Sequence, residues 1–156
     1  MLIRKNDAHL DFDFEKCLTE NRDNPIFYIQ YANARINSIK KLIIEKNIDI
    51  KKYNKNFLRL LDTKEELDII KKLSLWPKVI ETSVYYKEPH RIVYFMIEIS
   101  SMLHSFWNMG KSNAKYRIVV DNNILLTQAR LSLLEAVQAV IVNGLDTLSI
   151  KPLEAM

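Results

Sequence analysis

Glycine, proline and cysteine are scarce in this chain, whose 156 residues include two glycines, four prolines and one cysteine. Tight turns between strands rely on glycine and proline, so their scarcity argues against an all-β fold. The lone cysteine, Cys17, excludes an intramolecular disulfide. His9, His90 and His104 lie far apart, without the spacing of metal ligands, so we expect no metal site.

Long apolar runs are also missing, since no uninterrupted run reaches the roughly 20 residues that cross a bilayer. Arg4, Lys5 and Asp7 stand where a signal peptide would be apolar. We therefore expect a cytoplasmic protein with no membrane partner. The net charge of +4 and the pI near 9.1 are compatible with a polyanionic partner without establishing one.

Helical periodicity is what the sequence has in abundance, and it predicts an all-α bundle of about five helices. Prolines and capping residues mark where these helices begin. The expected starts are Asp23 or Asn24 with Pro25, Thr63 in a capping box with Glu66, Pro77, Pro89 and Asn123. The first helix should end near Lys46, and the last near Val142 with Gly144 as its left-handed cap.

The spacing of apolar residues also predicts which helix faces are buried. In the first helix the buried stripe is Ile29, Ala32, Ile36, Ile39 and Ile43; in the second it is Leu67, Ile70 and Leu73; in the last it is Leu126, Ala129, Leu133, Ala136, Val137 and Val140.

Residues 1–20 have a different pattern, because Leu10, Phe12 and Phe14 alternate with acidic residues. This period of two is typical of a strand or an extended arm with one apolar side. We therefore divide the chain into an extended N-terminal arm over 1–20 and a helical domain over 21–156.

The first helix carries a second stripe beside the buried one, formed by Tyr28, Tyr31, Arg35 and Ser38. An aromatic ring and a guanidinium one helical turn apart at the rim of a core can receive a flat ligand. From the residues alone, the opposing interpretation is a tyrosine at the edge of the core and a solvated arginine.

No group of residues forms a convincing catalytic site. Gly110-Lys111-Ser112 resembles the end of a phosphate-binding loop, but the first glycine of that motif is replaced by Ser105 and a helix precedes it. Asp11 and Asp13 fit a solvated strand face. His104 falls in a helical apolar pattern and is expected to be hydrogen-bonded in the core or at its edge.

Strings along almost the whole chain resemble the C-terminal anticodon-binding domain of arginyl-tRNA synthetases. The string Asn24-Pro25-Ile26-Phe27-Tyr28-Ile29-Gln30-Tyr31-Ala32-Asn33-Ala34-Arg35 is similar to the family form NPVFYVQYAHAR, and residues 1–14 resemble the segment that joins the catalytic part to this domain. Further matches occur in order at 88–91, 104–108, 129–131, 143–145 and 152–156. The HIGH and KMSKS signatures of class I synthetases are missing from these residues.

The resemblance implies recognition of the tRNA(Arg) anticodon stem-loop by Tyr31, Arg35 and Met156. We add Trp107 as an aromatic that can lie exposed at this RNA-binding site, and Lys40, Lys41, Lys46, Lys111, Lys115 and Arg117 as candidate phosphate contacts. No catalytic residue, metal, cofactor or DNA partner is expected in the chain, which should be inactive alone. ATP and arginine belong to the full enzyme, whose catalytic domain is the second expected partner.

Two departures from the family form fall near this expected site. Asn33 stands where histidine is usual, which should change local hydrogen bonding, and Ala155 stands where arginine commonly precedes the final methionine. Two other functions stay open at this point: the equivalent domain of another class I synthetase, and a helical module that binds a protein through Tyr28, Tyr31 and Trp107.

Overall fold

The computed structural model describes residues 24–48 and 55–156, and these residues form an all-α fold without strands. Cys17 and the arm predicted over 1–20 lie outside the described residues. Five α-helices and two short 3₁₀ segments follow one another. They are α2 (Pro25–Glu45), η1 (Lys55–Leu60), α3 (Lys64–Ser74), α4 (Trp76–Tyr86), α5 (His90–Ser112), η2 (Ala114–Tyr116) and α6 (Ile124–Thr147). The predicted all-α class and number of helices are confirmed for these residues.

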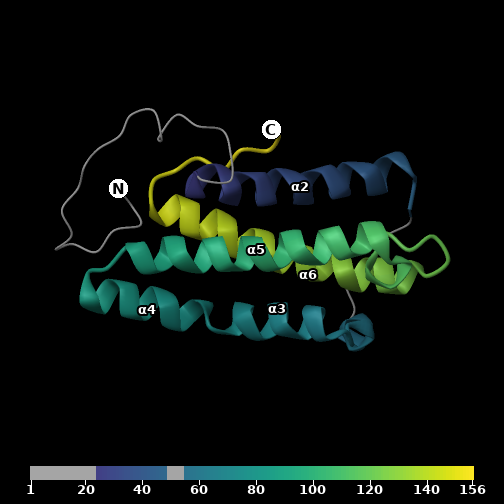
Figure 1. Ribbon diagram of the computed structural model, residues 1–156, viewed down its shortest axis with the longest axis horizontal. Coiled ribbons are helices and arrows are strands. Elements are labelled where there is room, and N and C mark those ends of the chain that lie inside the picture. Colours follow the sequence, from purple (N-terminus) through teal and green to yellow (C-terminus); the bar gives the residue numbers. More distant parts are fainter. Residues whose placement is uncertain (1–23, 49–54) are drawn as a thin grey trace.

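The helices are arranged in three layers (Figure 1). α2 forms one outer layer, α5 and α6 lie side by side in the middle, and α3 and α4 follow each other along the opposite side. The middle helices therefore contact both outer layers, and α2 is the layer nearest the C-terminal residues.

Three predicted helix starts have the expected capping geometry. The side chain of Asn123 accepts a hydrogen bond from the N–H of Leu126 at the start of α6. The side chain of Asn24 accepts hydrogen bonds from the backbone N–H groups of Ile26 and Phe27, and Pro25 occupies the first turn. Thr63 accepts from the N–H of Glu66 while the Glu66 carboxylate accepts from the N–H of Thr63, so the capping box is complete.

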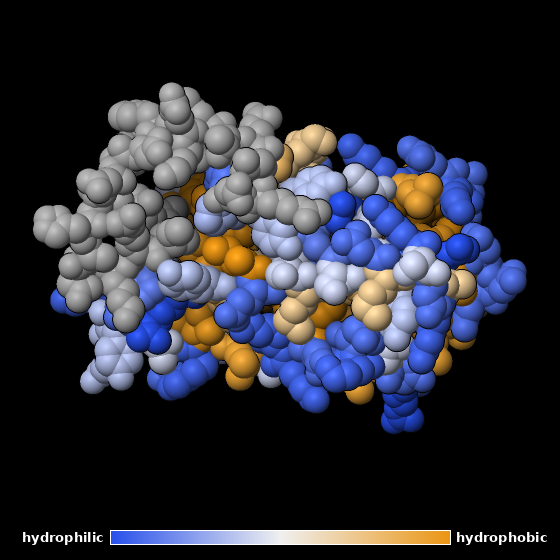
Figure 2. Space-filling view, viewed as in Figure 1, coloured by the Kyte–Doolittle hydropathy of each residue, from blue (hydrophilic) through white to orange (hydrophobic). Residues whose placement is uncertain are grey.

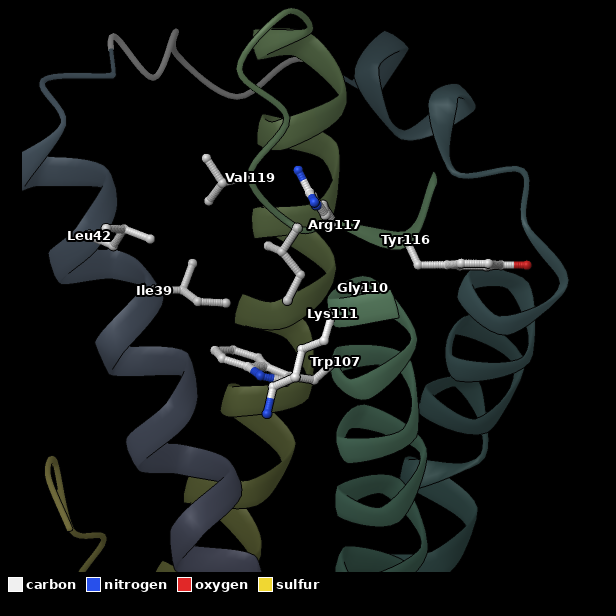
Figure 3. Close-up of a pocket in the computed structure, with 9 residues that line it drawn as sticks. Ile39, Leu42, Trp107, Gly110, Lys111, Tyr116, Arg117 and Val119 are labelled. Atoms are coloured by element: carbon white, nitrogen blue, oxygen red, sulfur yellow. The ribbon is translucent and has the colours of Figure 1, made fainter. Parts of the chain in front are cut away.

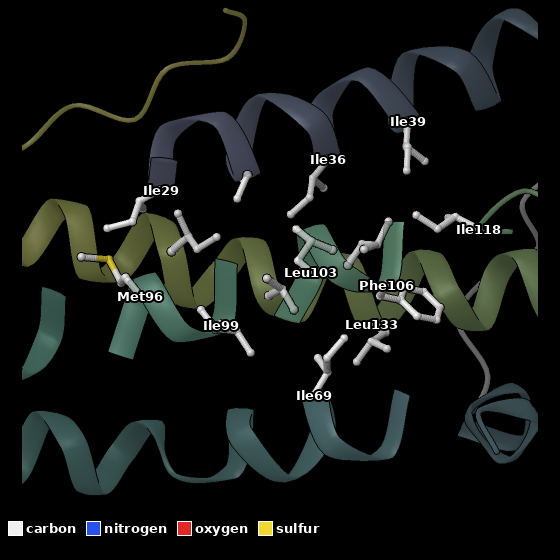
Figure 4. Close-up of a cluster of buried hydrophobic side chains, with 14 of the residues drawn as sticks. Ile29, Ile36, Ile39, Ile69, Met96, Ile99, Leu103, Phe106, Ile118 and Leu133 are labelled. Atoms are coloured by element: carbon white, nitrogen blue, oxygen red, sulfur yellow. The ribbon is translucent and has the colours of Figure 1, made fainter. Parts of the chain in front are cut away.

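The core lies between α2 and the α5–α6 layer and continues to α3 (Figure 4). All five residues of the predicted α2 stripe are buried, so that prediction is confirmed. They meet α5 side chains such as Met96, Ile99 and Leu103. Burying each large aliphatic side chain stabilises the fold by about 1.5 to 3 kcal/mol, which fixes α2 firmly against α5.

The predicted buried face of α3 is wrong for Leu67 and Ile70, whereas Leu73 packs against the core as expected. Leu67 and Ile70 are about 40% exposed, whereas Glu66 and Ile69, one position earlier in each case, are buried. The reason is that Glu66 turns inward to an ion pair with Arg130 of α6, which rotates the helix relative to its apolar stripe.

The predicted end of the last helix is also wrong. α6 continues through Gly144 to Thr147, and Ser149, at φ 57°, is the left-handed residue that follows it. The N–H of Ile150 then donates to the carbonyl of Leu145, which is the hydrogen bond of a Schellman ending. Gly144 serves a packing role instead, since a Cβ there would lie 2.4 Å from the sulfur of Met96. Ala136, expected inward, is exposed.

By length and composition alone, α6 is the one helix among the described residues apolar enough to cross a membrane, and 56% of its most apolar window is buried within the bundle. On the face in Figure 2, hydrophilic residues cover most of the surface and hydrophobic ones appear as separate patches. The apolar residues of α6 thus contribute largely to the core.

Candidate nucleic-acid interface

Arg35 is held between two aromatic rings at the rim of the bundle. Its guanidinium carbon lies 4.3 Å from the centre of the Tyr31 ring and 5.2 Å from that of Trp107. Nη2 also donates a hydrogen bond of 2.8 Å to the Tyr31 hydroxyl. The two α2 residues meet because they are one turn apart, while Trp107 approaches from α5.

His104 of α5 holds the Arg35 guanidinium in place through a hydrogen bond. Its Nδ1 lies 3.0 Å from Nη1 of Arg35, and its ring is in edge contact with Tyr28 at 4.7 Å. Arginine can only donate, so Nδ1 must accept, which leaves the proton on Nε2, the nitrogen that faces the carbonyl of Tyr28. The expectation of a hydrogen-bonded histidine at the core edge is confirmed, and Tyr28 packs against it.

We call Tyr31, Arg35, His104 and Trp107 the Arg35 cluster. Sequence reasoning did not assign His104 to it, although its spacing of three residues from Trp107 places both on one face of α5. Tyr31 is 36% exposed and Trp107 is partly exposed, so the cluster offers ring surface to a ligand. The guanidinium is orientated by two side chains before any ligand arrives.

The residues after α6 run along α2 and are held by side-chain amides. Gln30 donates to the carbonyl of Lys151 and accepts from the N–H of Leu153, at 2.9 and 2.8 Å. Asn33 and Asn37 donate to the carbonyls of Leu153 and Glu154. Residues 151–154 therefore follow α2 in the same direction, and we call them the C-terminal strip (Figure 1).

A second glutamine, Gln138 of α6, ties these amides to the bundle. Its Nε2 donates to Oδ1 of both Asn33 and Asn37, while its Oε1 accepts from Nζ of Lys40. Sequence reasoning expected Asn33 to change only local hydrogen bonding. The structure shows that this buried asparagine joins α2, α6 and the strip, a set of contacts that separate sequence positions do not reveal.

Met156 lies just beyond the strip and is half exposed. At 100° per residue, Gln30, Asn33 and Asn37 occupy a different side of α2 from Tyr31 and Arg35. No hydrogen bond or ring contact joins Met156 to the Arg35 cluster within the described part of the chain. Its role at the site therefore stays a prediction. The C-terminal strip leads toward Met156 along α2, the helix that carries Tyr31 and Arg35.

The candidate phosphate contacts fall into two groups. Lys40 and Lys46 make ion pairs, with Glu135 at 3.6 Å and Asp121 at 3.3 Å. Lys111 in the last turn of α5, Lys115 in η2 and Arg117 just after η2 are exposed and pair with no acidic residue among those described, and Lys41 of α2 is also exposed. Lys111 and Arg117, which line a groove together with Trp107, are better placed to meet a polyanion.

Together these features define a helical domain that presents an orientated arginine between aromatic rings, beside positive side chains that pair with no acidic residue in the described ranges 24–48 and 55–156. The profile of the DALR anticodon binding domain family matches residues 29–156, and the chain belongs to that family. It is similar to the arginine–tRNA ligases of Rickettsia typhi and Rickettsia prowazekii, with 46% and 45% identity. Each match covers the whole chain but 28% of the relative's length.

A solved structure shares the fold. The putative arginyl tRNA synthetase from Campylobacter jejuni matches with a TM-score of 0.76 over 99% of this chain and 32% of its own, at 22% sequence identity. The same helical arrangement therefore occurs as one part of that longer protein. This chain spans less than a third of the length of the proteins it matches.

Proposed function

We propose that the chain recognises the anticodon loop of tRNA(Arg), as the C-terminal domain of an arginine–tRNA ligase. The resemblance supports it together with one geometric observation: Arg35 is fixed by Tyr31 and His104 with ring surface exposed beside it. Unpaired bases bind proteins by stacking on aromatic or guanidinium planes and by bonding through their edges. The Arg35 cluster offers both kinds of contact within one helical turn.

In this proposal the domain performs recognition without chemistry. Joining arginine to tRNA with ATP belongs to the catalytic domain of the parent enzyme, which is cytoplasmic. The proposed contacts are Tyr31 and Trp107 as stacking surfaces, Arg35 as the hydrogen-bond donor to a base edge, and Met156 as an apolar contact from beyond the strip. The chain alone is expected to bind tRNA and to form no arginyl ester.

The test is a titration of the chain with tRNA(Arg) and with a variant tRNA changed only in its anticodon. Base stacking and edge bonds are each worth on the order of 1 to 3 kcal/mol, so we expect roughly tenfold weaker binding of the variant tRNA. Arg35→Ala should weaken binding of tRNA(Arg) by a similar factor and reduce the preference for it.

Arg91→Ala is the matched control, because Arg91 is an exposed arginine at the opposite end of α5 that pairs with Glu88. Its binding should equal that of the unchanged chain, and both variants should melt near the original temperature. Equal affinity of the unchanged chain for both tRNAs would contradict the proposal, as would unchanged binding by Arg35→Ala. Binding should also weaken steeply with salt, which an apolar protein interface would not show.

A further inference from the structure

An open groove of about 250 Å³ lies beside the Arg35 cluster, between α2 and the end of α5. Its floor is apolar, with Ile39 and Leu42 from α2, Trp107 from α5, and Ile118 and Val119 from the segment before α6. Figure 3 shows Ile39, Leu42 and Trp107 directed into the space between the two helices, while the Tyr116 ring points away from it. Trp107 belongs to both the groove and the Arg35 cluster, so the two features are continuous.

The rim of the groove is positively charged. Lys111 and Arg117 both line it, both are exposed, and neither makes an ion pair with another described residue. Among the described residues that line the groove, none is acidic. Lys111 lies one helical turn after Trp107, on the same face of α5, and Figure 3 shows its side chain beside the indole. An apolar floor with a cationic rim is complementary to a ligand that is flat, apolar and anionic at one end.

The wall of the groove is fixed by a buried arginine. Arg130 of α6 donates from Nη1 to the carbonyl of Arg117 at 2.6 Å and from Nη2 to that of Lys115 at 2.8 Å. Its Nε donates to the carboxylate of Glu66, and both side chains are buried. The segment that carries Arg117 and Ile118 is therefore held in place without a ligand, which lowers the ordering cost of binding one.

We propose that this groove binds one further unpaired nucleotide of the RNA loop, with its base on the apolar floor and its phosphate at Lys111 and Arg117. The inference rests on the proposed function, because the chain must bind the RNA loop for the groove to receive one of its nucleotides. The continuity through Trp107 is what assigns the groove to the same RNA. The groove volume of about 250 Å³ is slightly below that of pockets for drug-sized molecules, and this smaller size fits a single base.

The phosphate part is tested by the salt dependence of binding to a stem-loop RNA with the anticodon-arm sequence of tRNA(Arg). Each phosphate neutralised on a single strand contributes about 0.7 to the slope of log K against log salt, so the double variant Lys111→Ala/Arg117→Ala, which frees one phosphate, should lower the slope by roughly 0.7. The control is Lys71→Ala/Lys78→Ala, which removes equal charge from exposed residues of α3 and α4. The control should leave the slope unchanged.

The base part is tested with abasic nucleotides placed in turn at each loop position. At the position that enters the groove, loss of the base should weaken binding to the unchanged chain roughly tenfold. Leu42→Trp fills the groove from its α2 side, so the same abasic change should then have no effect. Ile44→Trp is the control, because Ile44 lies on the same helix, is 73% exposed and does not line the groove. It should keep the tenfold effect.

The outcomes separate the two proposals. If Arg35→Ala weakens binding but the groove variants behave like their controls, the groove inference is overturned and the proposed function stands. If the groove variants act as expected and Arg35→Ala does not, the groove stands and the Arg35 site falls. If the unchanged chain does not bind the stem-loop, both are overturned. Melting temperatures near that of the unchanged chain exclude unfolding as the cause of any loss.

Discussion

Arg130 and Glu66 form an ion pair that is almost wholly removed from solvent, with Nε of Arg130 2.7 Å from Oε1 of Glu66 and exposed fractions of 2% and 0%. Both partners also make hydrogen bonds outside the pair. Glu66 also completes the capping box of α3, and Arg130 also binds two carbonyls of the segment after α5. One pair of side chains thus joins α3, α6 and the wall of the groove.

Replacing Arg130 by methionine should destabilise the fold strongly. Glu66 would stay buried without its partner, and breaking such a pair costs about 3 to 5 kcal/mol. The double variant Arg130→Met/Glu66→Gln should recover part of this loss, because glutamine can keep the cap and carries no charge. Urea unfolding monitored by circular dichroism measures both. Equal stability of the single and double variants would contradict the role of the buried charge.

Asn33→Ala should release the C-terminal strip from α2. It removes the bond to the carbonyl of Leu153 and one of the two bonds that the Gln138 amide donates, at a cost of about 1 to 3 kcal/mol; the bond from Gln138 to Asn37 remains. Hydrogen exchange at the N–H of Leu153, which donates to Gln30, should become faster. Asn143→Ala, at an exposed position of α6, should leave that exchange rate unchanged.

Tyr31→Phe separates the two contributions of the tyrosine. The ring remains available for stacking, while the 2.8 Å hydrogen bond to Arg35 is lost. We expect binding of tRNA(Arg) to weaken about threefold, since an intramolecular hydrogen bond is worth roughly 0.5 to 1.5 kcal/mol, and to weaken further in Tyr31→Ala. Calorimetric titration of both variants measures this order. Identical affinities for the two would show that the ring does not stack.

Gly144→Val should lower the stability by at least about 2 kcal/mol. A Cβ at this position would lie 2.4 Å from the sulfur of Met96 and 3.2 Å from the ring of Trp76, so the added carbon atoms would overlap both side chains. Gly144→Ala should cost less, because alanine gains up to about 1 kcal/mol of helix propensity over glycine. Thermal unfolding of the three proteins gives the ranking. A valine variant as stable as the original would mean that α5 and α6 are not closely packed there.

The pH dependence of stability should include a small term from Asp68. The hydrogen bond from Lys64, at 2.7 Å, lowers the pKa of the Asp68 carboxyl below its ordinary value. Its contribution is therefore full above the unfolded pKa and is lost as pH falls through the lower folded pKa. Asp68→Asn should lower the melting temperature slightly at neutral pH and not at a pH below both values. A surface pair is weak, so a large difference would contradict this interpretation.

Local signals made much of the fold predictable. Asn24 with Pro25, and Thr63 with Glu66, act within one turn of the chain, so their capping roles follow from the sequence. The inward turn of Glu66 toward Arg130 does not, because that pair joins positions 64 residues apart. The packing role of Gly144 is hidden for a similar reason: its close neighbours belong to α4 and α5, and a helix end is the commoner place for glycine.

The site was partly predictable for the same physical reason. Tyr31 and Arg35 meet through helical spacing, which a sequence shows directly. His104 is 69 residues from Arg35, and the strip reaches Asn33 from 120 residues away. Such contacts depend on how helices pack, and only the folded chain brings them together.

After the turn at Ser149 the C-terminal strip runs along α2, to which it is attached through its main chain. Gln30, Asn33 and Asn37 bind main-chain atoms of Lys151, Leu153 and Glu154, and none of these bonds involves a side chain of the strip. The path of the strip is therefore encoded in α2, while the side chains it displays are encoded separately. Substitutions in 151–154 can alter what a ligand meets and leave the course of the backbone unaltered.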